Sequence, residues 1–82
     1  MNKVKQLANN QFEITTPEGM YFQSYNSVIV FIPKEGKVQL DEHYWNYSNA
    51  TGKFRNQILG ENINDTRLKI QKGEYELTDL NK

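Results

Sequence analysis

The sequence contains no cysteine, and this absence removes two ways of holding a small protein together. Without thiols there can be neither a disulfide framework nor a thiolate metal cage, so folding must rest on the burial of aromatic and aliphatic side chains. A chain without disulfides is typical of a reducing compartment. The sequence therefore predicts a location in the cytoplasm.

Long apolar runs and an excess of charge of one sign are also missing. Residues 1–12 never reach the run of about 7 apolar residues that a secretory signal needs, and no stretch approaches the length of a membrane span. Ten Lys and Arg balance ten Asp and Glu, so the chain lacks the overall basic field that draws a domain to phosphate backbones. We expect one domain, residues 1–82, without membrane contact.

Side chains for catalysis are scarce. Nucleophilic catalysis needs an activated side chain beside a base, and the sequence offers no cysteine and one histidine, His43. Asp41, Glu42 and His43 are adjacent, so on a helical turn they point in different directions and do not converge on one ion. The five glycines stand singly, which excludes a glycine-rich phosphate loop. We predict that the protein is not an enzyme and binds neither a metal nor a cofactor.

The first half of the chain alternates short β-type runs with turn signals, which is the pattern of an antiparallel meander. Residues 16–19 and 33–36 each contain a proline and a glycine, as tight turns require. A later run can close the sheet as a last strand. The predicted strands are residues 12–15, 20–25, 27–32, 37–40 and 75–80.

The run at 27–32 is apolar on both of its faces, because every residue from Val28 to Ile32 is aliphatic or aromatic. Helices can cover one face. The other face needs the N-terminal segment around Val4 and Leu7, a curled sheet, or a second chain.

The second half of the chain carries helix signals. Asp41 predicts a helical turn at 41–45, and Ser48 caps a helix at 48–59 with Phe54 and Ile58 on its apolar side. Gly60 suits the left-handed residue that ends it, and a second helix, capped by Asn64, follows at 64–72. The predicted class is α+β: a meander of about four strands, two short helices packed on the sheet, and a C-terminal strand.

The two predicted helices raise the question of nucleic-acid binding. Gly60 fits the turn of a helix-turn-helix motif, but Asn56, Thr66 and Lys69 do not suit the packing that nests two such helices. Because the chain is neutral, a helix pair that covers the sheet and displays solvated charges is favoured. The alternative is a nucleic-acid-binding surface made by the cations Lys53, Arg55, Arg67, Lys69 and Lys72.

Tyr44, Trp45 and Tyr47 form the densest aromatic cluster of the sequence. On a helical turn, residues one apart diverge by about 100°, so at least one of the three rings must point outward. Exposed tyrosine and tryptophan are common in binding hot spots. The cluster predicts a protein-binding patch, and it stays open whether Trp45 belongs to the core and Tyr44 or Tyr47 to the surface.

The second half of the chain contains the segments "LDEHYWNYSNATGKFRNQILGE" and "RLKIQKGEYELTDLN". With these segments it resembles a family of small uncharacterised bacteriophage proteins, for which the predicted cytoplasm would be that of the host cell. The resemblance implies an origin in a phage or other mobile element, and it transfers no catalytic role. The matching positions are Trp45, Tyr47, Ser48, Thr51, Lys53, Phe54, Arg55, Asn56, Leu59, Gly60, Glu61, Gly73 and Tyr75.

Three functions follow from these observations. The first is an accessory protein that binds a host or defence protein, or itself, without catalysis. The second is a nucleic-acid-binding module that uses the basic helix pair at 53–72. The third is a homo-oligomeric structural or assembly component.

Overall fold

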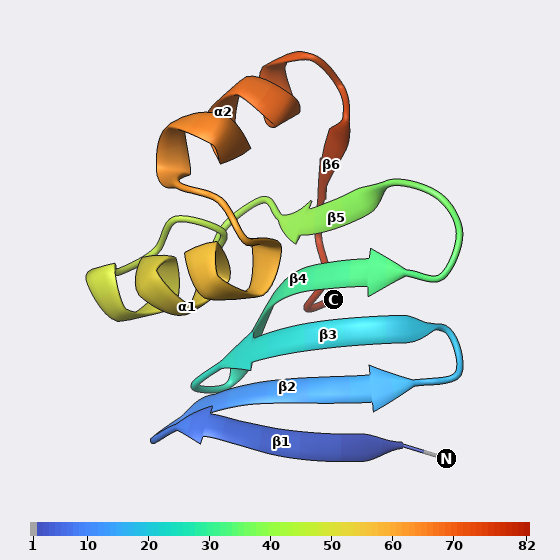
Figure 1. Ribbon diagram of the computed structural model, residues 1–82, viewed down its shortest axis with the longest axis vertical. Coiled ribbons are helices and arrows are strands. Elements are labelled where there is room, and N and C mark those ends of the chain that lie inside the picture. Colours follow the sequence, from blue (N-terminus) through green and yellow to red (C-terminus); the bar gives the residue numbers. More distant parts are fainter. Residues whose placement is uncertain (1) are drawn as a thin grey trace.

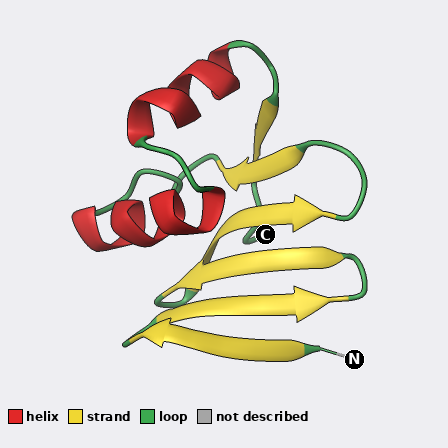
Figure 2. Cartoon of the chain, viewed as in Figure 1, coloured by secondary structure: helices red, strands yellow, loops and turns green. Residues whose placement is uncertain are grey.

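The computed structural model describes residues 2–82, which form one six-stranded sheet and two helices, an α+β arrangement (Figures 1 and 2). Strands and helices segregate along the chain, because five strands precede the helices and one follows them. The elements are β1 (Lys3–Ala8), β2 (Gln11–Thr16), β3 (Gly19–Ser24), β4 (Ser27–Pro33), β5 (Val38–Asp41), α1 (Asn49–Leu59), α2 (Ile63–Gln71) and β6 (Tyr75–Thr78).

The sheet is mixed, and its strands lie side by side in chain order. β1 to β5 pair antiparallel, as a meander does, whereas β6 pairs parallel to β5. A parallel neighbour needs a crossover connection, and the two helices supply it. The prediction of about four strands before the helices was wrong by one, because it missed β1. Lys3 and Lys5 make that segment look solvent-exposed, and lysines are typical of an edge strand.

The core lies between the sheet and the helices. Phe22, Val30 and Leu40 stand opposite one another on β3, β4 and β5, and each is fully buried. Phe54 and Ile58 of α1 pack against this cluster, which confirms the predicted apolar side of the helix. α1 lies over β3 and β4 and α2 lies against β6, so the helices cover the sheet separately (Figure 1).

A bulge explains part of the unusual apolar run in β4. The register between β3 and β4 shifts after Phe22, which leaves Ile29 without a partner residue on β3. Ile29 joins Val30 in the core, and the two are exposed by only 1% and 0%. Two consecutive apolar residues are thus buried on one side, because a bulge interrupts the alternation of side chains.

The opposite face of the sheet carries a second apolar row. Val4, Ile14, Tyr21 and Phe31 stand opposite one another on β1 to β4, one residue out of step with the core row. Successive strand residues point to opposite faces, so this row lies on the face away from α1. The rings of Tyr21 and Phe31 stack with their centroids 4.4 Å apart. We call these four residues the open row.

The N-terminal segment does not cover the open row, although it was one of three predicted covers. Residues around Val4 form β1 and lie in the plane of the sheet as its edge strand. Leu7 sits at a break in the β1–β2 register and packs against the core. Val4 itself is 65% exposed.

The helix ends follow the predicted capping residues with one exception. Ser48 caps α1 and accepts from the Thr51 amide, and Gly60 ends the helix with φ 67°, in the left-handed region. α2 begins at Ile63 and is capped by Asn62, not by Asn64. Both asparagines suit a cap, and only the Asn62 side chain accepts from the Asp65 amide.

Asp41 closes the turn between β5 and the helices, as the sequence predicts. Its buried carboxylate accepts from the backbone amides of His43 at 3.0 Å, Tyr44 at 2.9 Å and Leu80 at 2.9 Å. Burial alone would raise the pKa of this carboxyl, but the hydrogen bonds outweigh burial and lower the pKa. Asp41 thereby ties the C-terminal segment to the turn. Within residues 2–82, no helix has the length and apolar character needed to cross a membrane.

Candidate functional site

A groove lies between the β3–β4 turn and the start of α1. It has a volume of about 500 Å³, and aromatic rings form much of its wall. We call it the tyrosine groove, after Tyr25, Tyr44 and Tyr47. The complete lining is Ser24, Tyr25, Asn26, Ser27, Ile29, Tyr44, Tyr47, Ser48 and Thr51.

Hydroxyl groups fix the floor of the tyrosine groove. The Thr51 hydroxyl lies 2.9 Å from the Ser24 hydroxyl and accepts from the Ser48 hydroxyl at 3.0 Å. The Ser48 hydroxyl also caps α1 by accepting from the Thr51 amide at 3.2 Å. Ser24 and Thr51 are buried. These contacts join the end of β3 to the first turn of α1, so the two walls of the groove are held at a fixed separation.

The three tyrosines differ in exposure. Tyr47 is 68% exposed and Tyr25 is 52% exposed, whereas Tyr44 is half-buried and packs against the core. The rings of Tyr44 and Tyr47 meet edge to face, with centroids 5.4 Å apart. Tyr44 therefore supports Tyr47 from below and leaves it accessible.

Tyr25 holds an uncommon backbone conformation. Its φ is 55°, in the left-handed region, and its amide donates to the Asn10 carbonyl at 2.6 Å. A side chain with a β-carbon in this region costs roughly 1 kcal/mol, and asparagine or glycine is the usual occupant. The sequence predicts that Tyr25 belongs to a strand at 20–25. The signal that could have indicated a turn is the short Tyr25-Asn26 connection between two β-type runs.

Trp45 does not belong to the tyrosine groove, although the sequence grouped it with Tyr44 and Tyr47. Its ring is half-buried against the core, and the Arg55 guanidinium lies over it at 5.5 Å from the centroid. The predicted aromatic patch is therefore two features. Tyr44 and Tyr47 line the groove, and Trp45 packs beneath an arginine.

The five cations of the predicted nucleic-acid surface fall into two groups. Lys53, Arg55 and Arg67 line one cavity between α1 and the start of α2. Lys69 and Lys72 line another hollow, where they lie among acidic side chains. The second hollow is lined by Leu59, Gly60, Glu61, Asp65, Leu68, Lys69, Lys72 and Glu74. The structure does not bring the five together on one continuous surface.

Arg55 is the most deeply placed of these cations, with an exposure of 1%. Its Nη1 donates to the Trp45 carbonyl at 2.7 Å and to Asn46 Oδ1 at 3.3 Å, and its Nη2 donates to Asn56 Oδ1 at 2.9 Å. These bonds tie α1 to the segment that carries Trp45. An arginine on a short helix usually lies at the surface, so the sequence does not predict this burial.

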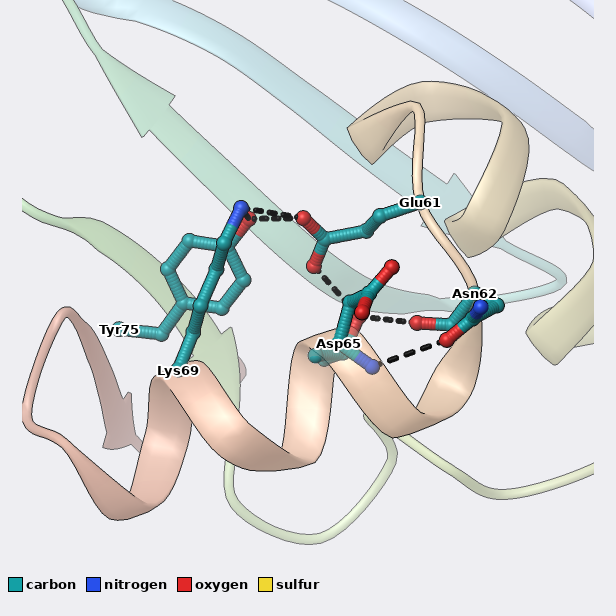
Figure 3. Close-up of polar contacts among 6 residues, drawn as sticks. Glu61, Asn62, Asp65, Lys69 and Tyr75 are labelled. Carbon is teal, nitrogen blue, oxygen red and sulfur yellow. Dashed lines mark hydrogen bonds and ion pairs between the residues drawn. The ribbon is translucent and has the colours of Figure 1, made fainter.

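Lys69 is held by Glu61, whose side chain is 6% exposed (Figure 3). The Lys69 ammonium donates to Glu61 Oε1 at 2.6 Å, the Tyr75 hydroxyl donates to the same oxygen at 3.0 Å, and Thr66 donates to Oε2 at 2.7 Å. Figure 3 shows Lys69 and Tyr75 reaching Glu61 from the same side. This cluster joins the α1–α2 turn, α2 and β6, and it is therefore a brace for the fold.

The charges of this cluster stabilise one another. Burial alone would raise the pKa of the Glu61 carboxyl, but hydrogen bonds from Lys69, Thr66 and Tyr75 outweigh it and lower the pKa. The hydrogen bond to Glu61 raises the pKa of Lys69. Lys69 is thus engaged by Glu61 as a cation, although its own side chain is 38% exposed.

Metal-ligating side chains do not gather anywhere in residues 2–82: no group of three or more His, Cys, Asp or Glu lies together there. His43 is exposed, and its Nε2 lies 3.6 Å from one Glu42 carboxylate oxygen. Asp41 uses its carboxylate for backbone amides instead.

The sequence matches a family of unknown function, DUF8033, over residues 1–76. The chain belongs to this family. The match includes the strands of the first half, so the family likeness is not limited to the second half of the chain, as the sequence analysis expected. Searches of curated proteins and of solved structures found no match.

Proposed function

We propose that this member of DUF8033 is a small non-enzymatic accessory protein that binds another protein through the tyrosine groove. The observation that carries the proposal is the exposure of two rings of the groove, Tyr25 at 52% and Tyr47 at 68%. Tyrosine offers a large contact area with few torsions to immobilise, and it is enriched in binding hot spots. The resemblance of the second half of the chain to small phage proteins supports a finer proposal. In it, the protein is of phage type and its partner is a host or defence protein.

The backbone of Tyr25 supports a binding role. A left-handed tyrosine is less stable in the turn than asparagine would be, and sparsely populated conformations gather at functional sites. The ring gains little in return from the fold, since half of it is exposed. A contact with a partner would use the ring that the turn presents.

The lining of the tyrosine groove indicates what kind of segment it accepts. No charged side chain lines it, while aromatic rings, one isoleucine and several hydroxyl and amide groups do. Such a surface suits an uncharged segment that inserts an apolar or aromatic side chain and makes a few hydrogen bonds. A strongly acidic or basic segment would lose hydration there without gaining an ion pair.

The experiment places a photo-crosslinking amino acid at Tyr47 and identifies the protein that it captures in host lysate. Purified partner is then titrated against the wild type, Tyr47→Ala and Tyr21→Ser. Tyr21 lies on the opposite face, so its substitution is the matched control. We expect Tyr47→Ala to weaken binding by about tenfold or more, since a hot-spot tyrosine contributes about 2 kcal/mol, and Tyr21→Ser to leave it unchanged. Equal affinity of all three folded proteins would refute the groove as the site.

Self-association is a second candidate, because the open row is a specific surface for it. Val4, Ile14, Tyr21 and Phe31 form a contiguous apolar strip, and such strips are frequent sites of association. Face-to-face packing of two such sheets would cover both strips. The mass in solution tests this: a dimer that becomes a monomer on Phe31→Ser supports it, and a monomeric wild type at high concentration excludes it.

Nucleic-acid binding is the weaker alternative in this arrangement. Lys69 is paired with Glu61, and the five cations are divided between two hollows, one of which also holds three acidic side chains. Retention on DNA or RNA that falls steeply with salt would favour the alternative.

A further inference from the structure

Arg55 is a buried cation that has no carboxylate in hydrogen-bond contact. Its three hydrogen bonds go to one backbone carbonyl and two asparagine side chains, all of which are neutral. Its Nε has no partner among residues 2–82, although it is buried. A buried cation without a carboxylate in direct contact is unfavourable, although the charge of Glu61, beyond hydrogen-bond reach, offsets part of this cost, and a buried donor without an acceptor adds to it. The guanidinium can therefore gain from an anion in contact with it.

The cavity beside Arg55 is suited to an anion. It has a volume of about 830 Å³ and is lined by three cations and no carboxylate. We call it the basic pocket. Its lining is Asn46, Ser48, Asn49, Gly52, Lys53, Arg55, Asn56, Gln57, Ile63 and Arg67. Both arginines of the whole sequence are in this list.

Lys53 and Arg67 also lack counter-ions. Both are exposed, and in the described part of the chain neither side chain makes a hydrogen bond or an ion pair, although the Lys53 ammonium lies 5.6 Å from the centre of the Phe54 ring. Burial lowers the pKa of Arg55, the positive charge of Arg67 lowers it further, and the negative charge of Glu61 offsets part of this effect. The two guanidinium groups line the same pocket and repel one another, and an anion between them would offset that repulsion.

Gly52 of α1 lines the pocket beside the Arg55 guanidinium. A glycine inside a helix costs about 1 kcal/mol relative to alanine, so its presence in α1 needs a local reason. A β-carbon there would lie 3.5 Å from Arg55 Nη2, an ordinary van der Waals contact that alanine could make. A side chain longer than that of alanine would reduce the space beside the guanidinium.

We propose that Arg55, Arg67 and Lys53 form a binding site for a small tetrahedral oxyanion, such as a phosphate group. Guanidinium groups match the oxygens of such an anion with paired N–H donors, and the ammonium of Lys53 adds a third charge at the exposed rim. The amides of Asn49 and Gln57 line the same pocket and can donate to further oxygens. This site adjoins the tyrosine groove, with which it shares Ser48, but it does not depend on the proposed protein partner.

The test uses the Nε–Hε signals of arginine in NMR, of which the chain has only two sources, Arg55 and Arg67. Inorganic phosphate is titrated into the full-length protein at constant ionic strength, with chloride as the balancing salt. We expect the Arg55 signal to shift and saturate, because Arg55 lines the pocket and its Nε–H has no partner among residues 2–82. Phosphate should also raise Tm over matched chloride, since a ligand that binds only the folded state stabilises it.

Variants separate binding from the structural bonds of Arg55. Arg67→Gln leaves those bonds intact and should weaken phosphate binding about tenfold, as expected for the loss of one charge-assisted hydrogen bond. Lys37→Gln removes one charge from the β4–β5 turn and should not change binding. Lys53→Gln serves as a second pocket variant with a smaller expected loss.

Phenyl phosphate distinguishes the source of the anion. Binding as tight as that of inorganic phosphate supports a site for a phosphoryl group carried by a larger molecule, and tighter binding of inorganic phosphate supports a site for the free ion. No saturable shift of Arg55 Nε–Hε, or the same affinity in the wild type and Arg67→Gln, would overturn the proposal.

Discussion

The two faces of the sheet carry similar apolar side chains in different surroundings. On the face beneath α1, Phe22, Val30 and Leu40 are fully buried. On the other face the open row runs across β1 to β4, and Val4 at its end is 65% exposed. Apolar surface contributes to stability in proportion to the area removed from water. The covered face therefore supplies most of the stability, and the open row retains surface that is available for contacts.

The largest test of this comparison is a pair of phenylalanine truncations. Phe22→Ala should lower the free energy of unfolding by about 3–5 kcal/mol, because it leaves a cavity in a closed core. Phe31→Ala on the open row should lower it by less than about 2 kcal/mol, because water can occupy the space. Chemical denaturation of both variants measures the difference. Equal losses would show that the open row is covered in solution.

A second test concerns Asp41, which follows Leu40 on β5 and points away from the core row. Asp41→Asn should lower the free energy of unfolding by about 2 kcal/mol, because an amide nitrogen would face a backbone N–H where a carboxylate oxygen now accepts. Equilibrium unfolding checks the value. Glu42→Gln, an exposed neighbour that does not accept from these amides, is the control and should change it little.

Acid should weaken the hydrogen bonds of Asp41 and those of Glu61 together. The pKa values of Asp41 and Glu61 are lowered in the folded protein from ordinary values of 3.8 and 4.5. A lowered carboxyl pKa means that the unfolded chain binds protons more readily, so this stability is present above the ordinary values and is lost as pH falls through the folded-state pKa. We expect Tm to fall below about pH 4.5. Glu61→Gln should flatten this decline, and an unchanged decline would remove Glu61 from the explanation.

The smallest expected effect is at Tyr25, beside the tyrosine groove. Tyr25→Asn should raise the free energy of unfolding by up to about 1 kcal/mol, because asparagine tolerates the left-handed region better. The same variant should weaken partner binding, which distinguishes a functional tyrosine from a structural one. Thermal unfolding together with the crosslinking assay measures both. A loss of stability would show that the ring contributes to packing.

Local signals in the sequence predicted the parts of the fold that local chemistry determines. Proline and glycine marked the turns at 16–19 and 33–36, and Ser48 and Gly60 marked the ends of α1. The sequence did not distinguish Asn62 from Asn64 as the N-cap of α2, because both are asparagines at suitable positions. β1 was missed because lysines such as Lys3 and Lys5 are common both in edge strands and in unstructured segments.

Features that depend on distant parts of the chain were not predictable in the same way. The bulge at Ile29 arises from the β3–β4 register. The buried Arg55 donates to the Trp45 carbonyl, which lies outside the helix predicted at 48–59. The tyrosine groove joins the β3–β4 turn to the start of α1. Each of these features depends on the tertiary arrangement. The sequence therefore predicted Tyr44 and Tyr47 as binding residues but not Tyr25.

The parallel pairing of β6 with β5 has a consequence for how the chain folds. β5 can pair with β4 as soon as its own hairpin closes, but its other edge must wait until both helices have formed and brought β6 back. Long-range pairings of this kind close slowly, because the chain entropy of the connection is lost before the contact is gained. During that interval β5 exposes unpaired backbone groups to other chains. Refolding yield should therefore depend on protein concentration more strongly than the stability of the finished fold would indicate.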